Sequence, residues 1–447
     1  MFDIDDQTRK DLELFGNTRY SDSVFSFFDH TRTAGGRERL AEWLRTPTND
    51  LETLQYRRDA IRFFLDHDVR PAVKAHQLEC IEQYYRLGVS VLRNNPLDAL
   101  FTHLSAQLKP DNDYYRIQTG IGQLILLFRQ LAGVLEGAKC AAMPHRLARQ
   151  LATIDALLAE PEIRVLCATG EKLSFARITR FDNLLRKQFR NPVLALLGTV
   201  YTLDACAAVA QAAKGKNFCF PEYLPGPAPR VDIEGLTHPL LEHPVENDVR
   251  VDGSYNLMVM TGPNMAGKST FLKALGLAVY LAHAGFPVPA RRMQTSLYNG
   301  LVTTINLPDN VKKGYSHFYA EVVRVRETAE KIREKRTVFV IFDELFRGTN
   351  VKDALDASLL IATAFARIRS STFFVSTHIT QVARELAGRR NVRFGYFDSR
   401  LEGGRPAYSY RLHEGVSEER LGLLIVQNEK ITEILDSIGE GMGEFGS

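Results

Sequence analysis

TGPNMAGKST, residues 261–270, decides the fold of this chain, because it matches G-x-x-x-x-G-K-[ST] at every fixed position. The apolar run NLMVM (256–260) precedes it, and the helix-like segment FLKALGLAVYLA (271–282) follows it. A phosphate-binding loop requires this order of strand, loop and helix. The sequence therefore predicts a P-loop that binds a nucleoside triphosphate.

The residue types in the loop suit phosphate and metal. Glycines let the backbone curl so that successive N–H groups converge on phosphate oxygens. Lys268 brings a positive charge to the terminal phosphates, and the Ser269 hydroxyl can bind Mg²⁺. ATP and Mg²⁺ are the predicted cofactors; a glycine turn that binds nothing is the alternative. The predicted cofactor-binding set is Gly262, Pro263, Asn264, Met265, Ala266, Gly267, Lys268, Ser269 and Thr270.

Two further apolar runs end in polar residues that suit hydrolysis. TVFVIFDEL (337–345) resembles a strand buried on both faces, so that Asp343 would hold Mg²⁺ and Glu344 would orient or deprotonate the attacking water. TFFVSTH (372–378) ends in His378, which is placed to sense the γ-phosphate, although a lone histidine is more often structural. The predicted catalytic residues are Glu344 and His378, and the predicted metal ligands are Ser269 and Asp343.

Composition excludes little. A formal charge of +3 is too small to indicate nucleic acid, so any DNA-binding surface has to be local. Five widely spaced cysteines, none in C-x-x-C, suggest reduced thiols, and the acidic amino-terminal sequence lacks an export signal, so we expect a cytoplasmic protein. The apolar runs 121–134 and 193–213 contain polar residues, and both are interpreted as buried helices rather than membrane spans.

The order of patterns predicts two domains. Residues 1–225 are mostly helical by periodicity, and FPEYLPGPAPR (220–230), with four prolines, marks a boundary. From there to residue 440, short β-like runs alternate with helices, which predicts an α/β sheet of largely parallel strands; residues 441–447 are expected to form a flexible tail.

A basic face is predicted on the segment 174–191. It would lie along a phosphate backbone or, more commonly for such patterns, be a solvated helix face. Its members are Arg177, Arg180, Arg186, Lys187 and Arg190.

Several motifs together resemble the MutS family of DNA repair ATPases. Besides TGPNMAGKST, they are VPA (288–290), DELFRGTN (343–350), STH (376–378) and GVSEERLG (415–422), in the family's order. THPLLEHPVEND before the loop resembles the family's lead-in near the adenine. LEL (12–14), FDHTRTAGGRERLAEWLRTP (28–47) and LETLQYRRDAI (51–61) resemble the start of its helical core.

This resemblance implies an ABC-type P-loop ATPase domain preceded by an all-α core or lever domain. It also implies a homodimer in which each head completes the other's site, with Gly314 and Ser316 of GYSHFYAE (314–321) reaching across. As a helix-capping serine, Ser316 could equally be structural. We expect a short member without the mismatch-recognition, connector and clamp domains.

The sequence thus predicts a Mg²⁺-dependent ATPase that acts as a nucleotide-gated dimer on double-stranded or branched DNA, with a possible repair-protein partner and no membrane role. The alternative is a dimerising switch that engages a protein rather than DNA. A third interpretation is a P-loop kinase, which the Asp-Glu pair makes less suitable because it favours water activation.

Overall fold

The computed structural model of the chain describes residues 2–16, 22–67, 73–92, 112–138, 143–170, 173–226, 228–263, 265–305, 317–402, 405–417, 431–433 and 435. The chain divides into two compact units. The sheet unit comprises Met1–Ser26, Thr46–Leu54 and Gly215–Ser447, and the helical unit comprises Phe27–Arg45 and Gln55–Lys214. The predicted tail, 441–447, lies outside the described residues.

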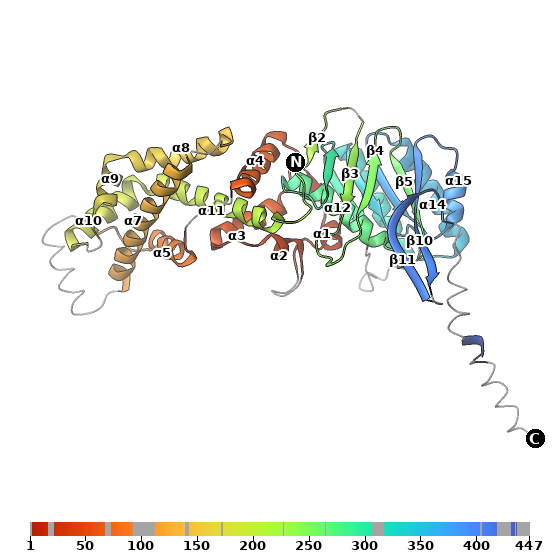
Figure 1. Ribbon diagram of the computed structural model, residues 1–447, viewed down its shortest axis with the longest axis horizontal. Coiled ribbons are helices and arrows are strands. Elements are labelled where there is room, and N and C mark those ends of the chain that lie inside the picture. The colour runs from red at the N-terminus through yellow and green to blue at the C-terminus, as the bar shows by residue number, and fades with distance from the viewer. Residues whose placement is uncertain are drawn as a thin grey trace, which may run out of the picture. The chain divides into compact units, whose positions relative to one another are not determined.

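A seven-stranded sheet organises the sheet unit, in the order β1-β7-β8-β9-β5-β10-β11, and every pair but the last is parallel. Its strands β5, β10 and β11 are labelled in Figure 1. A second sheet has the order β2-β6-β3-β4. This confirms the predicted α/β class with a parallel-rich sheet. The strands are β1 (Asp3–Ile4), β2 (Glu222–Tyr223), β3 (Val231–Leu236), β4 (Asn247–Val251), β5 (Leu257–Thr261), β6 (Arg292–Thr295), β7 (Gly300–Thr304), β8 (Val338–Phe342), β9 (Thr372–Ser376), β10 (Val392–Glu402) and β11 (Arg405–Glu414).

Helices cover both faces of the larger sheet, which is why its central strands are mostly apolar and buried at every position. Val338, Val340 and Phe342 of β8 join one core cluster with the helices after β7, β8 and β9. On the other face Ile341 approaches Gly276 of the helix after β5. The helices of this unit are α1 (Asp6–Asp11), α12 (Lys268–Ala284), α13 (His317–Lys335), α14 (Val351–Arg367) and α15 (Thr380–Leu386).

The helical unit is built around one apolar core. Its longest helices come from the two apolar runs noted in the sequence, and both contribute buried residues to that core. Two of the boundaries between units fall within α2 (Val24–Phe28) and α4 (Leu51–His67), and the other two follow Arg45 and Lys214. The other elements are α3 (Ala34–Arg45), α5 (Ala75–Arg86), α7 (Asn112–Ala138), α8 (His145–Ala159), α9 (Pro161–Ala168), α10 (Phe175–Asn183), the π-helix η1 (Leu184–Gln188) and α11 (Arg190–Ala213).

Helix α11 is the one helix in the described part of the chain that is long and apolar enough to cross a membrane by length and composition. Within this structure it packs in the core of the helical unit, and 61% of its most apolar window is buried. Its buried Asp204 accepts hydrogen bonds from the backbone N–H and hydroxyl of Thr33, at 3.0 and 2.6 Å. The buried carboxylate of α11 therefore has hydrogen-bond donors within the helical unit.

The predicted basic face loses one member. Arg186 is buried, and its guanidinium forms a two-pronged ion pair with the buried carboxylate of Asp182, with both N···O distances 2.6 Å. Asp182 also accepts a hydrogen bond from the Tyr84 hydroxyl. The π-helix carries an extra residue per turn, so the 3.6-residue periodicity used for the prediction fails at this point. Arg177, Arg180, Lys187 and Arg190 are exposed.

The first residues of the chain belong to the sheet unit, which differs from a division at residue 225. Strand β1 pairs with β7 as a parallel edge strand, and α1 follows it directly. Asp11 accepts hydrogen bonds from the Thr303 hydroxyl at 2.8 Å and from the Ile305 backbone N–H at 2.9 Å. The sheet unit is therefore assembled from three separate stretches of sequence.

A buried histidine in α12 makes the sheet unit sensitive to acid. The Tyr298 backbone N–H donates to His283 Nε2 at 2.9 Å, so Nδ1, 2.8 Å from the Val279 carbonyl oxygen, carries the proton of a neutral ring. Burial lowers the pKa of His283 to about 4. The unfolded chain binds a proton at this residue near pH 6.5, whereas the folded chain does so only near pH 4.

We therefore expect the free energy of unfolding to fall by up to about 3 kcal/mol through this residue as the pH drops from about 7 to 4. His283→Gln retains an acceptor for Tyr298 and should flatten that slope, whereas His243→Gln, at an exposed position, should keep it. Urea unfolding followed by circular dichroism across this pH range measures both. Parallel slopes in wild type and His283→Gln would contradict the assignment.

Candidate functional site

The candidate site lies at the carboxyl edge of the parallel strands, where their ends meet. Strand β5 leads into the glycine loop, residues 262–267, and α12 begins at Lys268. The side chain of Lys268 is buried, and its Nζ donates to the carbonyl oxygens of Gly262 and Pro263, both at 2.7 Å. The loop thus curls around its own lysine.

Two glycines in the loop are required by its geometry. Gly262 has φ 138°, and a Cβ there would lie 2.7 Å from the carbonyl oxygen of Phe397. Gly267 has φ 102°, and a Cβ there would lie 3.1 Å from Cδ1 of Tyr410. Because L side chains rarely adopt these φ values, any other residue would strain the loop.

The structure brings Asp343 and Ser269 into direct contact. The Ser269 hydroxyl donates to Asp343 Oδ2 at 2.5 Å, which brings the first turn of α12 to the end of β8. The other carboxylate oxygen, Oδ1, accepts from the hydroxyl of Ser376 at 2.5 Å. The Ser376 hydroxyl also accepts the Glu344 backbone N–H at 2.9 Å, so one buried side chain fixes both acidic residues.

The turn after β8 has unusual backbone conformations. Glu344 and Phe346 have φ of 54° and 62°, in the left-handed region that side chains other than glycine adopt only when the surroundings impose it. The Glu344 carboxylate is 3.5 Å from Nη1 of Arg347. A turn held in this way presents Glu344 at the edge of the site on a fixed backbone.

Burial controls the charges here. Burial lowers the pKa of Lys268, while the negative charges of Glu344 and Asp343 act in the opposite direction. Burial also raises the pKa of Asp343, against hydrogen bonds from Ser269 and Ser376 that lower it. Lys268 and Asp343 thus place opposite charges at the rim of the glycine loop. Such a pair suits a phosphate ligand that has a bound cation.

A cavity of about 300 Å³ adjoins the glycine loop. Gly267, Thr270 and Phe271 line it from the loop side, and Tyr410 of β11 also lines it. The Asn247 side chain fixes this part of β11, since it donates to the Tyr410 carbonyl oxygen at 3.0 Å and accepts the Leu412 N–H at 2.7 Å. The lining from the segment before the loop consists of Leu236, Thr237, His238, Leu241, His243, Pro244, Val245 and Asn247.

His238 gives this cavity a polar feature. Its Nδ1 is buried and has no hydrogen-bond partner among the residues that the structure describes. Burial lowers the pKa of His238, so the ring is neutral near pH 7. A neutral imidazole with an unused nitrogen, beside the aromatic rings of Phe271 and Tyr410, is suited to a planar heterocycle.

Not every predicted residue is placed. Asn264, Gly314 and Ser316 lie outside the described residues. His378 is exposed, between β9 and α15, and no hydrogen bond to its side chain is seen within the described ranges. Met265 is 81% exposed and Ala266 is buried. The roles of these residues remain predictions.

Sequence reasoning missed Ser376 and Tyr410 as functional candidates. Ser376 lies within the STH motif, but nothing in the motif indicates which carboxylate its hydroxyl contacts. Tyr410 lies 143 residues after Gly267 along the chain, and only the sheet order brings it to the loop. A short strand ending in serine beside the Asp-Glu strand is the only signal that could have found Ser376.

A metal ion could be held by oxygen ligands here. Within the described ranges no cluster of three or more His, Cys, Asp and Glu side chains forms a metal site. Mg²⁺ does not need one, because it is commonly bound through one or two protein oxygens together with water and substrate phosphates. The Ser269 hydroxyl and the Asp343 carboxylate, in contact at 2.5 Å, are such a pair.

Two family models match the chain. The model of MutS domain III matches residues 7–307, and that of MutS domain V, the ATPase domain of the family, matches residues 258–440. A curated relative, the DNA mismatch repair protein MutS of Persephonella marina, is 28% identical over 238 residues. That match covers 52% of this chain and 27% of the relative.

Proposed function

This chain belongs to the MutS family, and from that premise we propose that it is a Mg²⁺-dependent ATPase with an ABC-type P-loop head, working as a homodimer on DNA. One observation carries the proposal: Ser269 and Asp343 are in contact beside the buried Lys268, at the mouth of a glycine loop. The residues proposed to bind phosphate, to bind Mg²⁺ and to activate water thus lie together at one edge of the sheet.

The nucleotide would span the loop and the cavity beside it. Its phosphate oxygens would accept hydrogen bonds from backbone N–H groups of residues 265–269 and from the Lys268 ammonium, in place of the loop carbonyls that Lys268 now contacts. Its base would enter the cavity lined by His238, Phe271 and Tyr410. A volume of about 300 Å³ suits a nucleoside better than a larger ligand.

Ser269 and Asp343 would hold Mg²⁺, which neutralises phosphate charge when bound. Glu344 would take a proton from the attacking water, with its backbone fixed by Ser376. His378 and, from a second copy of the chain, Gly314 and Ser316 are proposed to contact the γ-phosphate. A homodimer is proposed because Gly314 and Ser316 of one copy would complete the site of the other.

DNA binding is proposed from the family and from the surface. The exposed basic residues Arg177, Arg180, Lys187 and Arg190 lie close together in sequence across α10, η1 and α11. Charges of this kind bind the phosphate backbone without reading sequence. Double-stranded or branched DNA is the proposed substrate, and a repair protein is the proposed partner.

ATP turnover on different DNA forms tests the proposal. Hydrolysis should require Mg²⁺, disappear in Lys268→Ala, and rise with at least one of homoduplex, mismatched or branched DNA, with binding that weakens as salt is added. ATP binding with no response to any DNA would instead support a switch that engages a protein. Transfer of phosphate to a small acceptor would support a kinase.

A further inference from the structure

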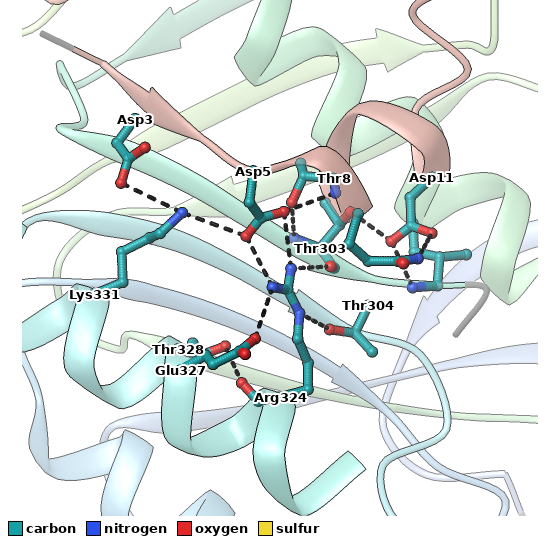
Figure 2. A network of polar contacts seen from close by, with 12 residues as sticks. Asp3, Asp5, Thr8, Asp11, Thr303, Thr304, Arg324, Glu327, Thr328 and Lys331 are labelled. Carbon is teal, nitrogen blue, oxygen red and sulfur yellow. Dashed lines mark hydrogen bonds and ion pairs between the residues drawn. The ribbon is translucent and has the colours of Figure 1, made fainter. Parts of the chain in front are cut away.

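The N-terminal segment Asp3–Leu14 is bonded to several parts of the sheet unit that surround the candidate site. Figure 2 shows the main cluster: the Asp5 carboxylate faces the Arg324 guanidinium of α13, with N···O distances of 2.8 and 3.1 Å. Lys331 lies about two turns further along α13. Its Nζ is 3.4 Å from the Asp3 carboxylate and 3.3 Å from the Asp5 carboxylate. Arg324 is nearly buried, and its side chain is 8% exposed.

The same cluster holds the carboxyl end of β7. Arg324 donates to the Thr303 carbonyl oxygen at 2.9 Å and to the Thr304 hydroxyl at 3.2 Å. The Thr8 hydroxyl accepts the Thr303 N–H at 2.9 Å, and Asp11 accepts from the Thr303 hydroxyl (Figure 2). Asp11 also accepts from the Ile305 backbone N–H. Every bond in this set positions the last residues of one strand.

That strand end is hydrogen-bonded to the backbone of Asp343, the residue proposed to hold the metal. The Asp343 backbone N–H donates to the Thr304 carbonyl oxygen at 2.9 Å. A shift of Asp343 on binding of nucleotide would therefore displace Thr304 and, through Arg324, Asp5. Only one residue, Thr304, separates the N-terminal cluster from the candidate site.

The segment is also tied to the helix that carries the phosphate-binding lysine. Glu13 is 2.7 Å from the Nζ of Lys273 in α12, and Leu12 packs close to Gly276 of the same helix. From there the carbonyl oxygens of Glu13 and Leu14 accept the N–H groups of Val24 and Phe25, each at 3.0 Å. Helix α2 starts at Val24, and the helical unit starts within it, at Phe27.

We propose that the segment Asp3–Leu14 transmits the nucleotide state of the site to the helical unit, with Asp5 and Asp11 as its positioning residues. The path runs from Asp343 through Thr304 to this segment and onward to α2. The inference rests on the proposed function, because it needs a nucleotide at the site. It adds the route by which that nucleotide would act on the other unit.

The fluorescence of a single tryptophan can report changes in the helical unit. Trp43 is the only tryptophan, and it lies in α3 of the helical unit, 6% exposed, with the Arg57 guanidinium 5.1 Å from its ring centre. Its emission therefore reports the helical unit alone. ATP affinity, measured by calorimetry, reports the site in the sheet unit alone.

The test uses the double variant Asp5→Asn with Asp11→Asn, and Asp6→Asn as a matched control. Asp6 lies in the same helix, but its side chain is 90% exposed and contacts only Arg9, at 3.7 Å, among the ion pairs seen in the structure. In wild type and in the control, Mg·ATP should change the Trp43 emission. In the double variant ATP affinity should stay within about threefold, while the emission change falls by at least about half.

Three results would overturn the inference: no Trp43 change in a wild-type protein that binds ATP, an undiminished change in the double variant, or equal losses of ATP affinity and emission change. The last would assign the cluster to the site itself. Absence of ATP binding in wild type is distinguishable from all three, because it removes the proposed function as well.

Discussion

Glu344→Gln should lower the kcat of ATP hydrolysis by about 10²- to 10⁴-fold while the affinity for Mg·ATP stays near that of wild type. Glutamine has nearly the same shape as glutamate but cannot accept a proton from water. The backbone of residue 344 is held by Ser376, so the substitution should leave the turn in place. Rapid-quench turnover and equilibrium ATP binding measure the two quantities separately.

A matched control is Glu334→Gln, because Glu334 is an exposed residue of α13 paired with Lys335 on the helix surface. It should hydrolyse ATP at the wild-type rate. If Glu344→Gln turned over normally while binding ATP, the proton acceptor would have to be another group, and His378 would be the next residue to replace. Trapping of ATP in a tighter dimer by Glu344→Gln would support the proposed contribution in trans.

The sheet and the loop were accessible from sequence because their signals are local. Strands β5, β8 and β9 each contain at least three consecutive apolar residues, and each ends where a polar motif begins. In a parallel sheet such ends must share an edge, so the proximity of Ser269 and Asp343 followed without any structural knowledge. The two residues are 74 positions apart, and the structure brings them into contact; their role as metal ligands stays a prediction.

The role of the N-terminal segment was inaccessible because its partners are distant. Asp5 and Arg324 are separated by 319 positions, and α1 has only six residues, too few for periodicity to show which face is buried. The segment was therefore grouped with the helices that follow it. Arg186 shows a different failure, since a π-helix rotates every later residue relative to the expected face.

Ser376→Ala should weaken the apparent affinity for the Mg²⁺ that supports hydrolysis by about 10- to 100-fold, because residues that orient a metal ligand commonly contribute that much. The Ser376 hydroxyl has a single proton, which it donates to Asp343, and it accepts the N–H of Glu344. Alanine would leave a buried carboxylate oxygen and a buried N–H without this partner. Asp343 would then be free to rotate away from Ser269.

Ser371→Ala is the matched control for this substitution. Ser371 lies just before the amino end of the same strand, is also fully buried, accepts the Val338 N–H at 3.1 Å and donates to the Arg336 carbonyl oxygen at 2.8 Å. Each alanine should therefore lower the free energy of unfolding by a similar amount, about 1–3 kcal/mol. Only Ser376→Ala should raise the Mg²⁺ concentration needed for half-maximal hydrolysis.

The comparison separates stability from positioning. Metal-free ADP binding should change little in either variant, because it depends on the glycine loop and the neighbouring cavity rather than on Asp343. A similar rise in the Mg²⁺ concentration needed by both variants would point to general loosening of β9 and contradict a specific role for Ser376. An unchanged Mg²⁺ dependence in Ser376→Ala would mean that Ser269 and the buried turn after β8 hold Asp343 in place without it.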